Sequence, residues 1–170
     1  MGKLSPYMLD NAARRGTRVH ELTQLIDYGL PLEALEIEPD IAGYIKAYLD
    51  FLRDYRPTWQ MIEQPVYSYL FGFAGTLDRY GIIGRKKTIV DIKTTASANR
   101  LTKIAWATQT RGYNFADHME DVEQRLIVQL KPTGKYTVHD CTNDECRYGI
   151  DSYSLFCDCL HLTKIIGGYE

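Results

Sequence analysis

The sequence predicts an α/β fold, because segments with the periodicity of helices and segments with the periodicity of strands alternate along it. Residues 39–55 repeat apolar side chains at the i, i+3, i+4 and i+7 spacing of a helix with one buried stripe. Residues 86–93 hold a largely apolar run typical of a strand, and Pro132-Thr-Gly134 is a turn between two further strand-like runs. The order of helix, helix, three strands, helix, two strands and helix favours an α/β sandwich with a mixed sheet.

The N-terminal third is expected to hold two helices and the first strand. Thr17 is a good N-cap for a first helix that ends near Asp27, with His20 in its first turn. The second helix fills residues 39–55, and residues 59–69 form the first strand.

The next two strands are expected to be neighbours joined by a short turn from Gly81 to Gly84. Side chains alternate along a strand, so Asp91 and Lys93 share one face, and pairing of the strands brings Asp78 beside Asp91. Charges in an apolar sheet are costly unless they are paired or bind a metal, and two carboxylates can bind a hard cation such as Mg2+. The stretch therefore outlines a site for phosphodiester cleavage, in which the lysine holds an attacking water or a phosphate charge.

The C-terminal half completes the predicted fold. Ser97 or Asn99 can cap the helix that follows the lysine-bearing strand. The helix, the two strands of a hairpin and a closing helix are expected at residues 99–118, 122–130, 136–141 and 150–166.

Four short motifs with chemistry-bearing residues follow one another at ordinary spacings: Gly16-Thr-Arg-Val-His20, Gly75-Thr-Leu-Asp78, Asp91-Ile-Lys93 and Gln109-Thr-Arg-Gly-Tyr113. In this order they resemble the motifs of the PD-(D/E)xK nuclease superfamily. The resemblance is closest to the RecB-like branch, which includes phage-type exonucleases, and it covers roughly residues 13–116 of this sequence.

This resemblance implies a restriction-endonuclease-like α/β/α sandwich with a central mixed sheet. It implies one nuclease domain over residues 1–170, with the motif-bearing core at about 13–116 and a closing hairpin and helix at 117–170. The implied activity is that of a metal-dependent DNA exonuclease working in recombination, repair or phage DNA processing.

The resemblance also implies the roles of the site residues. His20, Asp78, Asp91 and the backbone carbonyl of Ile92 would hold Mg2+ or Mn2+. Lys93 would orient or deprotonate the attacking water. Gln109 and Tyr113 lie four residues apart, on one face of their helix, and would fix the scissile strand. Glu63 is a second-rank candidate near the metal, with a glutamate at the rim or in a salt bridge as the equal alternative.

Positive charge is concentrated around the candidate site, although the whole chain has a net charge of -2. Residues 65–113 carry eight basic and two acidic side chains, and the two acids are Asp78 and Asp91. A phosphate backbone favours such a distribution. The candidate contacts to the DNA backbone are Arg79, Arg100, Lys103 and Arg111. Trp106 fits either stacking on a base or packing in the core.

The four cysteines, Cys141, Cys146, Cys157 and Cys159, raise the question of a zinc site. Their spacing differs from the short ligand pairs of zinc sites, and Cys157 and Cys159 diverge on a helix. Some RecB-like relatives hold an iron-sulfur cluster with one cysteine before the nuclease core, but this chain has none before Cys141. Reduced, buried thiols are therefore expected, with zinc unlikely and no iron-sulfur cluster.

The composition, with 45% apolar and 25% charged residues, is typical of a globular protein. No apolar run approaches the length of a membrane span, and we expect a cytoplasmic protein in a bacterial or phage-infected cell. The expected partners are DNA ends, with a recombinase, a single-strand annealing protein or a helicase as a possible protein partner. Three alternatives stay open: an endonuclease with the same site, a non-catalytic DNA-binding or helicase-partner module, and a zinc-stabilised interaction protein.

Overall fold

The computed structural model describes residues 6–119, 121–143 and 151–167. The chain folds into two compact units, each assembled from separate stretches of sequence. Unit 1 consists of Met1–Arg56, Ile92–Ser97 and Val128–Thr137. Unit 2 consists of Pro57–Asp91, Ala98–Ile127 and Val138–Glu170.

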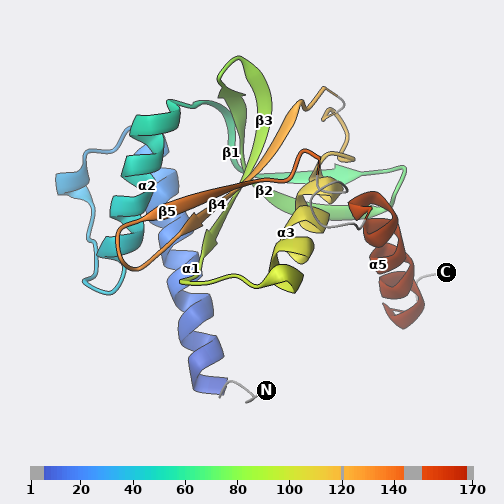
Figure 1. Ribbon diagram of the computed structural model, residues 1–170, viewed down its shortest axis with the longest axis horizontal. Helices are drawn as coiled ribbons and strands as arrows, with labels where there is room; N and C mark the ends of the chain where they lie inside the picture. Colours follow the sequence, from blue (N-terminus) through green and yellow to red (C-terminus); the bar gives the residue numbers. More distant parts are fainter. Residues whose placement is uncertain (1–5, 120, 144–150, 168–170) are drawn as a thin grey trace. The chain divides into compact units, whose positions relative to one another are not determined.

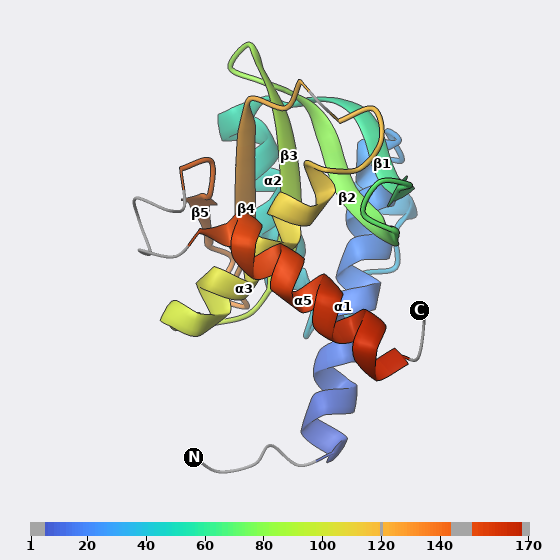
Figure 2. The same ribbon diagram turned by 90° about the vertical axis from the view of Figure 1, so that its right-hand side faces the viewer.

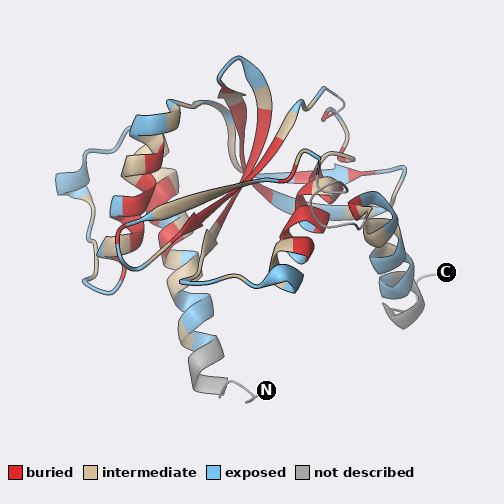
Figure 3. Ribbon diagram, in the orientation of Figure 1, coloured by how far each residue is buried: buried red, intermediate tan, exposed pale blue. Residues whose placement is uncertain are grey.

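The helices of unit 1 are α1 (Pro6–Asp27), the short 3-10 helix η1 (Leu32–Ala34) and α2 (Ala42–Tyr55). α1 and α2 lie side by side (Figure 1), and the Tyr48 hydroxyl donates a hydrogen bond to Asp27 Oδ2 at 2.6 Å. The buried face of α2 carries Tyr44, Tyr48 and Phe51, which follow the predicted helical spacing (Figure 3).

The prediction that Thr17 caps the first helix is wrong. α1 is already helical from Pro6, so Thr17 lies inside it and His20 lies well beyond its first turn. The alanines and arginines between residues 12 and 15 are strong helix formers, and they carry the helix through the position where a cap was expected.

The sheet has five strands in the order β1-β2-β3-β4-β5. They are β1 (Thr58–Ser68), β2 (Phe73–Ile83), β3 (Lys86–Thr94), β4 (Gln124–Leu130) and β5 (Tyr136–Asp140). Both β1 with β2 and β2 with β3 pair antiparallel. The boundary between the two units falls inside β3 and inside β4, so both strands run from one unit into the other.

The hydrogen bonds at the strand ends establish that the sheet is mixed. Where β3 and β4 begin, Glu123 N–H donates to the Lys87 carbonyl at 2.8 Å; where they end, Thr95 N–H donates to the Leu130 carbonyl at 3.2 Å. The two strands are therefore parallel, with a helix in the connection between them. The Cys141 N–H donates to the Arg125 carbonyl at 2.8 Å, which makes β5 antiparallel to β4. The prediction of an α/β fold with a mixed sheet is confirmed.

Both hairpins of unit 2 turn where the backbone enters the left-handed region. β2 continues to Ile83 and turns at Gly84 and Arg85, with φ of 55° and 72°, so the turn predicted at Gly81–Gly84 lies later than expected. Gly81 is needed for a different reason, since a Cβ there would lie 2.2 Å from the Thr58 carbonyl oxygen. The β1–β2 connection has Tyr69 and Leu70 at its tip, 84% and 85% exposed.

The helices of unit 2 are α3 (Arg100–Tyr113) and α5 (Ser152–Gly167), which lie against each other (Figure 2). Asn99 caps α3 and accepts a hydrogen bond from the Thr102 N–H at 2.9 Å, as one of the two predicted caps. α3 ends at Tyr113 rather than near residue 118, because single turns follow it and His118 has a φ of 70°.

Two apolar clusters lie in the core of the described part of unit 2. One joins the strands to the end of α3 through residues that include Leu77, Ile89 and Tyr113. The other contains Trp106 and Ile127, so the tryptophan packs in the core and is not a stacking platform. In the described part of the chain, no helix has both the length and the apolar character needed to cross a membrane.

Candidate metal centre

Asp78 and Asp91 lie on neighbouring strands of unit 2. The register of β2 and β3 runs to the pair Arg79–Val90, and the two aspartates are the next residues along on their strands. Asp91 is fully buried and Asp78 is 7% exposed. Two acidic side chains with so little access to water require compensating groups, such as hydrogen-bond donors or a cation.

Glu63 of β1 adds a third carboxylate to this part of unit 2. It lies between the β1–β2 pairs Ile62–Arg79 and Gln64–Leu77, and its carboxylate oxygen is within 4.8 Å of that of Asp78. Its φ is 46°, a left-handed conformation that residues other than glycine adopt at an energetic cost. Of the two alternatives from the sequence, the salt-bridged glutamate is observed, and it also lies beside the aspartate.

Arg79 is the partner of Glu63. Its guanidinium NH1 donates to Glu63 Oε1 at 2.8 Å and to the Asp78 carbonyl oxygen at 2.7 Å. The Arg79 side chain is fully buried. The prediction that Arg79 contacts a DNA backbone is therefore wrong, because a buried guanidinium already bound to a carboxylate does not reach a phosphate.

Gln109 and Tyr113 of α3 form a hydrogen-bonded pair. The Gln109 side-chain amide donates to the Tyr113 hydroxyl oxygen at 2.8 Å, as their four-residue spacing allows. Gly75 faces this tyrosine: a Cβ there would lie 3.3 Å from Tyr113 Cε1.

The charges of the three carboxylates affect the pKa of the Tyr113 hydroxyl. Burial raises the pKa of the Tyr113 hydroxyl to about 12, against the opposing effect of the hydrogen bond from Gln109. Asp91, Asp78 and Glu63 each raise this pKa further. Tyr113 is therefore a neutral hydroxyl near a negatively charged group of side chains, able to donate a hydrogen bond at physiological pH.

His20 and Ile92 meet in unit 1. The His20 ring nitrogen Nε2 lies 3.2 Å from the Ile92 carbonyl oxygen, and the protonated tautomer donates to that oxygen. Neighbouring ligands of an ion with bonds of about 2.1 Å are themselves about 3 Å apart, so the two atoms have the spacing of adjacent metal ligands. Lys93 follows directly on β3, two residues beyond Asp91, and is partly buried.

The described residues contain a set of His and carboxylate groups that could hold a metal ion: His20, Glu63 and Asp78. His20 belongs to unit 1, and the two carboxylates belong to unit 2. The donors are one imidazole nitrogen and carboxylate oxygens, which several divalent metals accept, so the donor set does not select one of them.

No cysteine of the described ranges joins such a group. Cys141 is a buried free thiol, as predicted, whereas Cys157 is partly buried and Cys159 is exposed on α5, so the prediction of buried thiols is wrong for Cys159. Cys146 lies outside the described residues.

The other basic candidates for DNA contact lie on α3. Arg100 is exposed at its first turn, and Lys103 and Arg111 are partly exposed. The Arg111 guanidinium lies over the Phe115 ring, 5.4 Å from its centre. These three residues stay predicted contacts.

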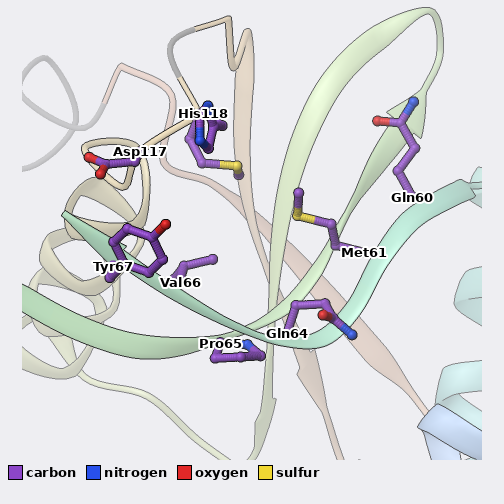
Figure 4. A pocket seen from close by; sticks show the side chains of 9 residues that line it. Gln60, Met61, Gln64, Pro65, Val66, Tyr67, Asp117 and His118 are labelled. Atoms are coloured by element: carbon purple, nitrogen blue, oxygen red, sulfur yellow. The ribbon is translucent and has the colours of Figure 1, made fainter.

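A hollow of about 410 Å³ in unit 2 lies at the edge strand β1 (Figure 4). Met61, Val66 and Tyr67 line it from β1, and Asp117 and His118 line it from the loop after α3. Asp117 N–H donates to the Tyr67 carbonyl at 2.8 Å and attaches that loop to the strand. None of the predicted site residues lines this hollow.

Sequence reasoning missed the role of Arg79, although one signal was available. Arg79 is the only charged residue in the second half of β2, and Glu63 is the only acidic residue in β1. A buried arginine needs an acceptor, so the two were a possible pair. The left-handed backbone of Glu63 has no signal in the sequence.

Comparison with known proteins does not identify a family. No family model matches the chain, and no curated protein matches it. Among solved structures, the crystal structure of SSO0001 is similar with a TM-score of 0.42 and 15% sequence identity, over 91% of this chain and 71% of that one. A similarity at this level establishes neither a family nor an activity.

Proposed function

We propose that this protein is a divalent-metal-dependent nuclease of the PD-(D/E)xK type that hydrolyses phosphodiester bonds of DNA. The observation that carries the proposal is a group of carboxylates in unit 2: the buried Asp78 approaches the partly buried Glu63 within 4.8 Å, and the buried Asp91 occupies the adjacent strand. Buried carboxylates gathered in one place repel one another unless cations lie among them. Mg2+ and Mn2+ are cations that take such oxygen ligands.

The proposed ligands are Asp78, Asp91, the Ile92 carbonyl and His20. Asp91 and Ile92 are consecutive residues of β3, so the peptide bond between them connects an aspartate with the carbonyl oxygen that His20 approaches. This continuity along one strand supports a common ion for the four groups. A metal ion bound there would lower the pKa of a water molecule and neutralise charge on a phosphate.

The remaining side chains would act on the water and the DNA strand. Lys93 is two residues beyond Asp91 and projects on the same side of β3, where its ammonium group orients the attacking water and stabilises the charge of the transition state. The water oxygen forms a new bond to phosphorus as the bond to one deoxyribose oxygen breaks. Gln109, exposed on α3, contacts the scissile strand, and the protonated Tyr113 hydroxyl holds its amide.

The proposed preference for DNA ends is inferred from the resemblance to the RecB-like branch. An endonuclease would use the same residues, so cleavage products decide between the two. Unwinding of duplex ends, where it is needed, would come from a helicase partner, since the sequence contains no phosphate-binding loop of the P-loop type.

The test is digestion of linear single-stranded and double-stranded DNA with labelled ends, beside a closed circle, in Mg2+, Mn2+ or EDTA. We expect metal-dependent loss of linear DNA, an intact circle, and no cleavage by the Lys93→Ala variant. Cleavage of the circle would replace the exonuclease by an endonuclease. Folded protein without cleavage in any metal would favour the non-catalytic DNA-binding module.

A further inference from the structure

We propose that Arg79 is a positioning residue that holds Glu63 in place as an additional carboxylate of the metal centre. This inference rests on the proposed function, because it concerns the same site. Glu63 lies where it does because Arg79 holds it, and Arg79 has this role instead of contacting DNA.

Arg79 cannot be buried without an acceptor. Its side chain is fully buried, and one nitrogen donates both to Glu63 Oε1 and to the Asp78 carbonyl oxygen, at 2.8 and 2.7 Å. An uncompensated guanidinium in the interior would be strongly destabilising, so these bonds are obligatory. The planar guanidinium therefore fixes the Glu63 carboxylate relative to the main chain of Asp78.

The backbone of Glu63 indicates that its side chain is constrained. A φ of 46° inside a strand is energetically unfavourable for a residue other than glycine. Such a conformation persists when other interactions hold it. The ion pair with Arg79 is an interaction of this kind, and it acts on the side chain of the strained residue itself.

The charges explain why the Glu63 carboxylate both forms an ion pair with Arg79 and lies beside Asp78. Glu63 bonds Arg79 through Oε1 and offers a carboxylate oxygen within 4.8 Å of Asp78. With one oxygen neutralised by the guanidinium, repulsion between the two acids is reduced before any ion binds. The Glu63 carboxylate is then preorganised to help bind a divalent cation.

The experiment is a double-mutant cycle on Mn2+ affinity, measured without DNA by the electron paramagnetic resonance signal of free Mn2+. Loss of a residue that orients a metal ligand typically weakens metal affinity by about 10–100-fold. We expect Arg79→Met and Glu63→Gln each to weaken Mn2+ binding within that range. In the Glu63→Gln background, Arg79→Met should cause no further loss.

Arg125→Met is the matched control, because Arg125 is a second buried arginine among the described residues of unit 2. Its NH1 donates to the Ala107 carbonyl at 3.1 Å and to Thr110 Oγ1 at 3.4 Å. We expect Arg125→Met to lower the melting temperature and leave Mn2+ affinity unchanged. Arg79→Lys, which keeps the buried charge, serves if Arg79→Met does not fold, and it should also weaken Mn2+ binding because a lysine lacks the planar fork.

The outcomes separate this inference from the proposed function. If Arg79→Met weakened Mn2+ binding equally in the wild-type and Glu63→Gln backgrounds, Arg79 would not act through Glu63. Wild-type Mn2+ affinity in Arg79→Lys or Arg79→Met would exclude the positioning role. Either result would leave the metal centre standing. Wild-type protein that binds no Mn2+ would overturn both the inference and the metal-dependent nuclease.

Discussion

Lys93 differs from the two aspartates because an ammonium group does not ligate a metal. We expect Lys93→Ala to keep the fold and the affinity for Mn2+ and to reduce DNA cleavage by at least about 100-fold, the typical cost of losing a group that stabilises the transition state. Asp78→Ala and Asp91→Ala should lose both Mn2+ binding and cleavage. Cleavage rates and Mn2+ binding isotherms on the same preparations measure the two effects.

Lys46→Ala is the control for these variants. Lys46 is an exposed lysine of α2 whose ammonium group pairs with Asp50 at 2.6 Å, and it has no part in the proposed site. Its replacement should leave cleavage at the wild-type rate. Cleavage by Lys93→Ala at the same rate as Lys46→Ala would contradict the role of Lys93.

The raised pKa of Tyr113 predicts a change in stability at alkaline pH. An unfolded tyrosine ionises with a pKa near 10, and the pKa of Tyr113 in the folded protein is about 12. The folded state therefore favours the neutral hydroxyl, and its contribution to stability is complete below pH 10 and is lost as the pH rises towards 12. We expect the free energy of unfolding to fall less steeply over this interval in Tyr113→Phe than in the wild type.

Urea denaturation at several pH values between 9 and about 12 measures this difference. Burial and the hydrogen bond to Asp54 also raise the pKa of Tyr136 to about 12, so the wild type loses stability there for more than one reason. Tyr136→Phe provides the comparison in unit 1. If the free energy of unfolding changed with pH by the same amount in the wild type and in Tyr113→Phe, the raised pKa of Tyr113 would be refuted.

At the scale of the elements, the start of α3 gives a direct test of capping. Asn99 accepts the Thr102 N–H, whereas Ser97, the other cap suggested by the sequence, lies two residues before it. Asn99→Ala should lower the free energy of unfolding by about 1 kcal/mol, the usual cost of removing an N-cap. Ser97→Ala should change it by less than about 0.5 kcal/mol, as for most surface substitutions. Urea denaturation compares the variants, and equal losses would contradict the assignment of the cap.

The elements show which signals a sequence carries. The helix at α2 and the strands from β1 to β5 were predictable, because each buries one side or both sides and its apolar residues repeat accordingly. The predictions of a helix N-cap at Thr17 and of a turn starting at Gly81 were wrong, because threonine also occurs inside helices and glycine also occurs inside strands. Thr17 lies within a longer helix, and Gly81 leaves space for the Thr58 carbonyl of the neighbouring strand.

The candidate site was predictable only in part, for a physical reason. Asp78 and Asp91 stand out because carboxylates are rare within apolar strands, and Gln109 and Tyr113 follow from helical spacing. Arg79 was expected to be an exposed basic residue, because a sequence does not show which side of a strand is buried by other elements. Its burial and its bond to Glu63 depend on the pairing of β1 with β2.

At the scale of the whole molecule, neither unit is a contiguous part of the sequence. Unit 1 takes the ends of β3 and β4 from segments that lie far beyond its N-terminal helices, and unit 2 takes their beginnings. A single cut in the chain therefore cannot release either unit intact. The sequence-based expectation of one domain over residues 1–170, with no linker along the chain, stays a prediction.

The exposed tip of the β1–β2 hairpin makes the protein a natural substrate for limited proteolysis. Chymotrypsin cleaves after large apolar side chains, and Tyr69 and Leu70 are accessible at the tip. A nick there would place Glu63 and Asp78 on different fragments that are held together by the pairing of the two strands. We expect the nicked protein to remain associated and to keep its Mn2+ affinity, as checked by native mass spectrometry and spin-resonance titration. Separation of the fragments would instead show that the covalent connection at Tyr69 and Leu70 is needed to hold the two acids together.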